Sequence, residues 1–263
     1  MNLLEKLASV SLQKDEIGAA FLGQAGFVLR GSDGTTAAVD PYLGNICEKE
    51  FGFKRLIPPP LKPEELKVDI LAATHSHRDH LDPDILKALP GETLCVGAMD
   101  CGGVFLENGI PPERFTLLKA GDSCTIRGVG FRAVYADHGE LAPEAVGFVL
   151  GINGFSFFVT GDTAYRPDEM MDSLGEIFVD GMFVPINPAF GNPGAADSVK
   201  MGVRVRPGFL AAVHFGMFAE HGGDPEEFMR EAGALPAGTV PFVPRAGDLC
   251  VYSRQRGLRK AEI

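Results

Sequence analysis

Four residues of types that bind metal ions lie within six consecutive positions of the sequence. The stretch THSHRDHLDP, residues 74–83, contains His75, His77, Asp79 and His80. A regular helix or strand would point these side chains in different directions, because residues rotate by about 100° in a helix and alternate faces in a strand. A loop can turn them toward one point. Imidazole and carboxylate groups suit zinc, manganese and iron, so the stretch predicts a catalytic metal site.

Further ligands are predicted at the ends of later apolar runs. His138 lies just beyond one run, Asp162 follows the run FSFFV, and His214 ends the run FLAAVHF. Four donors in so short a segment cannot easily all bind one ion, so these residues are expected to complete the coordination. His221 is the sixth histidine. We expect it to be either an exposed loop residue or a substrate contact at the mouth of the site.

The predicted metal loop lies between a buried strand and a helix. The run VDILAAT, residues 68–74, is continuously apolar, as in a strand buried on both faces. Asp82 followed by Pro83 is typical of a helix start, with an N-cap and a proline at the first helical position. The same pair at 224–225 and the window 195–205 predict two later helices. A site at the end of a buried strand agrees with the usual position of sites in open sheets.

One pattern occurs in each half of the chain. The turns GSDGT (31–35) and GINGF (151–155) each join two apolar runs, as antiparallel hairpins require. Each hairpin leads into a strand that ends at an acidic residue, Asp40 in the first half and Asp162 in the second. The recurrence predicts one domain, residues 1–263, built from two similar halves.

Composition limits the classes of partner. The net charge is -11 and the pI about 5.0, and Lys and Arg form no block, which argues against nucleic acid and anionic membranes as partners. No secretory signal or membrane span is recognisable, so we expect a cytoplasmic protein. The five cysteines form no CxxC pair and are expected to be reduced and mostly buried.

The motif HSHRDH, together with Asp40, Asp162 in TGDT, and His214, resembles the metallo-β-lactamase superfamily, whose loop reads H-x-H-x-D-H. Within it the chain is most similar to the L-ascorbate-6-phosphate lactonase-like metal-dependent hydrolases. The segments that carry this closer resemblance are FLGQAGFVLRGSDGTTAAVDPYLG, GIPPERFTLLKAGD, AADSVKMG, AAVHFGMF and DPEEF. The resemblance covers roughly residues 19–245. It implies an α/β (α+β) fold, a four-layer αββα sandwich with the site at one edge between the sheets.

The resemblance also implies two divalent ions per chain, zinc or manganese in the first place and iron as an alternative. The implied ligands are His75, His77 and His138 for the first ion, Asp79, His80 and His214 for the second, and Asp162 between them. Asp40 would orient the ligand loop through hydrogen bonds. Asp137 would replace or assist His138 if that position varies.

The implied activity is hydrolysis. Two ions lower the pKa of a shared water, giving a hydroxide nucleophile, and polarise the group under attack. Asp79 and Asp162 are then the catalytic carboxylates. The expected substrate is a lactone or other ester of a small metabolite, with or without a phosphate group. The alternatives are a binuclear phosphodiesterase and a non-catalytic metal-binding protein.

An anionic small molecule is compatible with the predicted site. Two divalent ions, two carboxylates and a hydroxide sum to about +1 under standard charge assignments. Arg78 and Arg166 are candidate partners for an anionic group, with a plain surface role as the alternative. Asn187 and Asn192, in the loop PINPAFGNPG, are candidate hydrogen-bond donors to the substrate. A homo-oligomer is compatible with the sequence.

Overall fold

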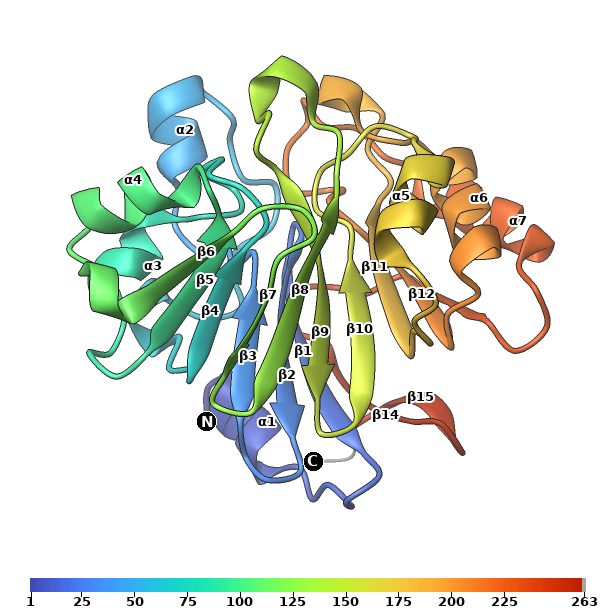
Figure 1. Ribbon diagram of the computed structural model, residues 1–263, viewed down its shortest axis with the longest axis horizontal. Coiled ribbons are helices and arrows are strands. Elements are labelled where there is room, and N and C mark those ends of the chain that lie inside the picture. The colour runs from blue at the N-terminus through green and yellow to red at the C-terminus, as the bar shows by residue number, and fades with distance from the viewer. Residues whose placement is uncertain (262–263) are drawn as a thin grey trace.

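Two β-sheets packed face to face form the centre of the molecule in the computed structural model, which describes residues 1–261 (Figure 1). Within this range the first sheet has eight strands in the order β15-β14-β1-β2-β3-β4-β5-β6, and the second has seven in the order β13-β12-β11-β10-β9-β8-β7. Helices α3 and α4 lie beside the first sheet, and α5, α6 and α7 lie beside the second. The predicted four-layer αββα sandwich is confirmed.

The strands and helices have the following bounds. The first sheet consists of β1 (Ile17–Gly23), β2 (Gly26–Gly31), β3 (Thr36–Val39), β4 (Ile70–Ala73), β5 (Leu94–Ala98), β6 (Phe115–Leu118), β14 (Leu249–Ser253) and β15 (Gly257–Lys260). The second consists of β7 (Ser123–Ile126), β8 (Val129–Tyr135), β9 (Val146–Ile152), β10 (Phe155–Val159), β11 (Gly181–Pro185), β12 (Phe209–Val213) and β13 (Val240–Phe242). The helices are α1 (Leu3–Ser9), α2 (Ile46–Phe51), α3 (Pro83–Ala88), α4 (Cys101–Glu107), α5 (Pro167–Leu174), α6 (Ala195–Val205) and α7 (Pro225–Glu231). None of these helices is both long and apolar enough to cross a membrane.

The two sheets repeat one pattern of strand directions. In the first sheet β1, β2 and β3 pair antiparallel, and β3, β4, β5 and β6 then pair parallel. In the second sheet β8, β9 and β10 pair antiparallel, and β10, β11, β12 and β13 then pair parallel. Parallel neighbours have their carboxyl ends at the same edge of a sheet. Loops that follow β3, β4, β10, β11 and β12 are therefore available to build one site.

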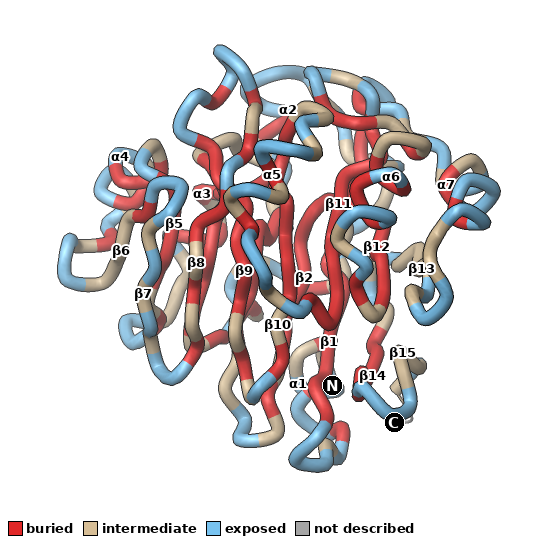
Figure 2. The backbone as a smooth tube through the Cα atoms, turned by 45° about the vertical axis from the view of Figure 1, so that its right-hand side comes forward, coloured by how far each residue is buried: buried red, intermediate tan, exposed pale blue. Residues whose placement is uncertain are grey.

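Aromatic side chains fill the space between the sheets. Phe27 of β2 stacks on Phe183 of β11, with ring centroids 3.9 Å apart and an interplanar angle of 8°. Phe209 of β12 meets Phe183 edge to face at 5.7 Å. Figure 2 shows that the central strands are buried along most of their length. Burial of each such ring stabilises the fold by roughly 2 kcal/mol. The two sheets are therefore packed tightly against each other below the edge that carries the site.

The predicted helix starts are confirmed, and one of them anchors the metal loop. Asp82 accepts a hydrogen bond from the backbone N–H of Asp84 at the start of α3. The same carboxylate accepts from the N–H groups of Leu43 and Gly44, at 3.0 and 2.7 Å. Asp82 therefore ties the chain that follows the metal loop to the chain that follows β3.

Candidate metal centre

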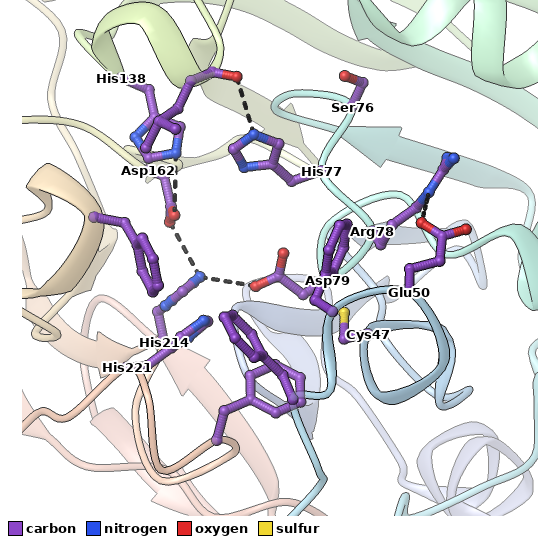
Figure 3. Close-up of a pocket in the computed structure, with 15 residues that line it drawn as sticks. Cys47, Glu50, Ser76, His77, Arg78, Asp79, His138, Asp162, His214 and His221 are labelled. Carbon is purple, nitrogen blue, oxygen red and sulfur yellow. Dashed lines mark hydrogen bonds and ion pairs between the residues drawn. The ribbon is translucent and has the colours of Figure 1, made fainter.

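The predicted metal loop lies at the carboxyl end of β4, where loops from both sheets meet. Asp40 follows β3, Asp162 follows β10, and His214 follows β12. Figure 3 shows Asp79, Asp162 and His214 turned toward one another at the base of a cavity, with His77 and His138 above them. Residues far apart in the sequence thus converge at the sheet edge, as the strand-end positions predict.

The ligands expected for the second ion form a compact cage with Asp162. Nε2 of His214 lies 3.0 Å from Nε2 of His80 and 3.2 Å from Oδ2 of Asp79. Oδ1 of Asp162 lies 3.3 Å from Nε2 of His214 and 3.4 Å from Nε2 of His80. In a tetrahedral zinc site with bonds of about 2.0 Å, neighbouring donors are about 3.3 Å apart. The spacing of these four atoms therefore fits one bound ion.

The ligands expected for the first ion form a neighbouring group. One donor nitrogen from each of His75, His77 and His138 lies within 4.8 Å of the other two. Oδ2 of Asp162 is 3.8 Å from Nε2 of His138, which places this carboxylate between the two groups. Among the described residues, Nε2 of His75 and Oδ1 of Asp162 are buried without a hydrogen-bond partner. Bound cations would satisfy these atoms, so the donor set fits two divalent ions.

The electrostatics of the cluster favour the metal-binding forms of Asp162 and His75. Burial alone would raise the pKa of Asp162, but His214 and His80 hold it well below its usual value. Burial and the neighbouring His80 lower the pKa of His75 well below its usual value. Asp162 is therefore ionised and His75 neutral near pH 7. Metal ions require these forms of the two ligands. Burial alone would lower the pKa of His80, but the carboxylates of Asp162, Asp40 and Asp79 raise it well above its usual value, so a bound ion must displace a proton from that ring.

Asp40 orients His80 through a hydrogen bond to the ring nitrogen that faces away from the cage. Its buried carboxylate accepts hydrogen bonds from Nδ1 of His80 at 2.8 Å, and from the N–H and hydroxyl of Thr74 at 2.8 and 2.7 Å. Because Nδ1 is engaged with Asp40, Nε2 of His80 faces the cage. Asp40 thus occupies the orienting position that the sequence suggests.

Gln24 is a site residue that the sequence analysis missed. Its amide nitrogen lies 2.8 Å from Oδ2 of Asp79 and 3.1 Å from Nδ1 of His221, and Nε2 of His214 is also 3.1 Å away. The amide has two protons, so it can donate to Asp79 and His221 and leave His214 free for an ion. The available signal was its place in FLGQAGF, a lone polar residue between glycines in an apolar run.

Left-handed backbone conformations mark the same residues. Gln24, Asp40 and His214 have φ values of 53°, 46° and 60°. Residues other than glycine adopt this region rarely, and such strain concentrates at functional sites. The fold therefore holds these three residues in unfavourable conformations that aim their side chains at the cluster.

His221 is buried, so the expectation of an exposed loop residue is wrong. Its exposed fraction is 5%, because its ring stacks on His214 at 4.7 Å and meets Phe218 edge to face at 4.9 Å. Burial and the neighbouring His214 lower the pKa of His221 to about 4, so the ring is neutral near pH 7. His221 lines the cavity, and one of its ring nitrogens lies within 4.8 Å of donor atoms of Asp79 and His214, so it is also a candidate metal ligand; a contact with substrate stays a prediction.

Three candidate substrate contacts lie outside the lining of the cavity. Arg166 donates to Asp137 at 3.0 Å, and Asp137 belongs to neither ligand group. Asn192 donates to Oδ2 of Asp162 at 2.8 Å, and Asn187 accepts from Asn192 at 3.3 Å. Both asparagines are buried, and they position the carboxylate of Asp162 between the two ligand groups. The sequence had instead predicted that both would contact the substrate directly.

Replacing Gln24 by methionine is expected to lower the affinity for one ion per chain by about 10- to 100-fold, the usual effect of removing an outer-shell hydrogen bond. Methionine keeps the length of the side chain but cannot donate to Asp79. The measurement is metal content by mass spectrometry after dialysis against a weak chelator. Gln255→Met, in the exposed turn before β15, is the control. Equal metal content in all three proteins would contradict the role given to Gln24.

Comparison with known proteins agrees with this geometry. Residues 35–215 match the model of the Beta-lactamase superfamily domain. The chain is 29% identical over 253 residues to a UPF0173 metal-dependent hydrolase from Cupriavidus taiwanensis, covering 87% of this chain and 84% of that one. A UPF0173 metal-dependent hydrolase from Methanosarcina mazei is 25% identical over 231 residues, covering 83% and 92%.

Solved structures show the same fold. Igni18, a metallo hydrolase from Ignicoccus hospitalis, superposes with a TM-score of 0.70 at 17% identity, over 90% of this chain and 99% of that one. A possible metal-dependent hydrolase from Veillonella parvula superposes with a TM-score of 0.73 at 17% identity, over 88% and 98%. With residues 35–215 matched by the family model and a His/Asp cluster at the sheet edge, this chain belongs to the beta-lactamase superfamily.

Proposed function

We propose that this chain is a metal-dependent hydrolase that uses two divalent ions, zinc or manganese, to cleave a lactone or other ester of a small metabolite. The observation that carries the proposal is the cage of Asp79, His80, Asp162 and His214, which opens onto a cavity of about 420 Å³. This volume lies in the range of small-molecule sites. The narrower resemblance to lactonase-like hydrolases supports a cyclic ester.

Water is the nucleophile that the lining residues favour. Burial and the charge of Asp79 raise the pKa of the Cys47 thiol to about 12, so it stays protonated near pH 7. The hydroxyl of Ser76 donates to Asp100 at 2.8 Å, and no histidine is hydrogen-bonded to it among the described residues. When bound, the ions would lower the pKa of a shared water and polarise the ester carbonyl. The chain contributes the ligands, their orientation by Asp40 and Asn192, and a cavity beside them.

Metal content and turnover test this proposal together. The wild-type protein is expected to hold about two divalent ions per chain by mass spectrometry and to open lactones or cleave aryl esters. His77→Ala and Asp162→Ala are each expected to lose metal and turnover. One ion or none in the wild type after reconstitution, unchanged by either substitution, would refute the ligand assignment. Cleavage of bis(p-nitrophenyl) phosphate without any ester or lactone cleavage would replace the proposal with a phosphodiesterase.

A further inference from the structure

An aromatic wall borders the cavity above the metal centre. We use this name for Phe51, Phe53, Phe190 and Phe218, all of which line the cavity. The ring centroid of Phe53 is 6.2 Å from that of Phe51 and 6.0 Å from that of Phe190. Phe51 is 58% exposed and Phe190 is 46% exposed. Exposed aromatic rings gathered at a cavity are typical of a surface that a ligand covers.

The backbone holds Phe190 in place at a conformational cost. Phe190 has φ 56° and ψ 27°, a left-handed conformation that is unusual for a bulky side chain. Its ring lies 5.5 Å from that of His221 and 6.0 Å from that of Phe53, and it covers little of the core. The same loop carries Asn192, which holds Asp162. The strained backbone thus holds a ring beside the metal centre, as expected of a residue that contacts a ligand.

No unpaired cationic side chain faces the cavity in the described part of the chain. Arg78 is the basic residue in the lining, and it donates to Oε2 of Glu50 at 2.9 Å. Figure 3 shows this pair at the cavity wall. An anionic substituent at the wall would therefore meet a neutral ion pair, which offers it no free cation, and the electron-rich faces of aromatic rings, which repel negative charge.

We propose that the substrate is an ester without any charged group and carries an aromatic or branched apolar substituent that packs on the aromatic wall. This proposal rests on the proposed function and narrows it: a phosphorylated or carboxylated metabolite is disfavoured. His221 connects the aromatic wall to the ligand cage, because its ring contacts both Phe53 and His214. A substituent on the wall would thus place an adjacent ester carbonyl over the cage. Hydrolysis adds one water across the acyl C–O bond and gives an alcohol and a carboxylic acid.

Three γ-butyrolactones that differ only at the ring substituent provide the test. We expect kcat/KM for the γ-phenyl lactone to exceed that for the γ-methyl lactone by at least about tenfold, as apolar pocket contacts usually achieve. The γ-carboxy lactone is expected to be the poorest of the three. A γ-carboxy lactone that equals or exceeds the γ-phenyl lactone would overturn the proposal.

Binding of γ-lactams separates this proposal from the proposed function, because binding does not require turnover. Calorimetric titration of the zinc-loaded protein is expected to show 5-phenylpyrrolidin-2-one binding at least about tenfold more tightly than pyroglutamate. This preference without cleavage of any lactone would support the apolar site and refute ester hydrolysis. Equal affinities, or tighter binding of pyroglutamate, would overturn the apolar site.

Substitutions in the aromatic wall and in the Arg78–Glu50 ion pair test which residues cause the preference for the phenyl substituent. Phe53→Ala and Phe190→Ala are each expected to shrink the phenyl-to-methyl ratio in kcat/KM by several-fold or more, while Phe178→Ala, an exposed ring outside the lining, leaves the ratio unchanged. Glu50→Gln frees Arg78 and is expected to raise kcat/KM for the γ-carboxy lactone relative to the γ-phenyl lactone. An unchanged ratio in both wall variants, with wild-type thermal unfolding, would contradict the placement of the substituent.

Discussion

Asp162→Asn is expected to lower kcat/KM by at least about 10³-fold, because a metal-binding carboxylate contributes several kcal/mol to stabilisation of the transition state. Oδ1 of Asp162 lies 3.3 Å from Nε2 of His214, and Oδ2 lies 3.8 Å from Nε2 of His138. Asparagine keeps the shape but removes the charge and turns one oxygen into a donor. Both ligand groups then lose the shared negative charge, and only one oxygen remains as an acceptor.

Metal analysis and steady-state rates on the same preparation check this result. Both metal content and turnover are expected to fall in Asp162→Asn, while thermal unfolding of the metal-free protein changes little in cooperativity. Asp168→Asn is the matched control, since its carboxylate lies six residues later, is 79% exposed and forms a surface ion pair with Arg204. Wild-type metal content together with wild-type kcat/KM in Asp162→Asn would exclude Asp162 as the shared ligand.

The convergence of the candidate metal ligands could be predicted because their signal is local. His75, His77, Asp79 and His80 occupy one loop, and the remaining ligands each lie at the end of an apolar run. Strand ends meet at one edge wherever parallel strands pair, so position along the chain was enough to bring them together. Hairpin turns and helix starts could be predicted for the same reason, since they are encoded within a few residues, whereas the four-layer fold was implied by the resemblance to a known superfamily.

The residues that shape the cavity could not be predicted, because their roles depend on partners distant in sequence. Arg78 looked available for an anion, but Glu50, on helix α2, neutralises it. His221 looked exposed because its neighbours are small and polar, but the chain folds back and stacks it on His214. Asn192 was recognised as a donor, yet its acceptor, Asp162, became clear only from the packing of two loops.

The aromatic wall shows the same dependence on tertiary structure. Phe53 follows helix α2, Phe190 lies after β11, and Phe218 lies after β12, so no spacing within the sequence links them. Their convergence requires both sheets to be in place. The expectation of a substrate with a phosphate group came from resemblance and from the charge of the ions, whereas the wall and the Arg78–Glu50 pair favour an uncharged substituent. The candidate metal ligands are thus encoded by local sequence, whereas the residues that would contact the substrate are brought together only by the packing of loops.

Asp40→Asn is expected to destabilise the metal-free protein by about 3–5 kcal/mol, the usual effect of removing one partner from a buried pair. His80 and Thr74 direct three donors at this carboxylate, and asparagine can accept on one oxygen only. His80 then loses the contact that fixes its orientation, so metal affinity is also expected to fall by about 10- to 100-fold. Urea unfolding of the metal-free protein and competition with a chelator measure the two effects separately.

Asp69→Asn provides a closely matched control for Asp40. Asp69 also accepts from the N–H and hydroxyl of a threonine, Thr36, at 2.9 and 2.8 Å, but its side chain is 39% exposed and contacts no histidine. Water can replace its lost bonds, so the expected destabilisation is about 1 kcal/mol or less, with metal affinity unchanged. If Asp40→Asn behaved like Asp69→Asn in both measurements, the carboxylate behind His80 would be a structural cap on Thr74 with no part in holding the metal ligand. A loss of metal affinity in Asp40→Asn but not in Asp69→Asn would instead show that Asp40, held by its strained backbone, orients His80 for metal binding.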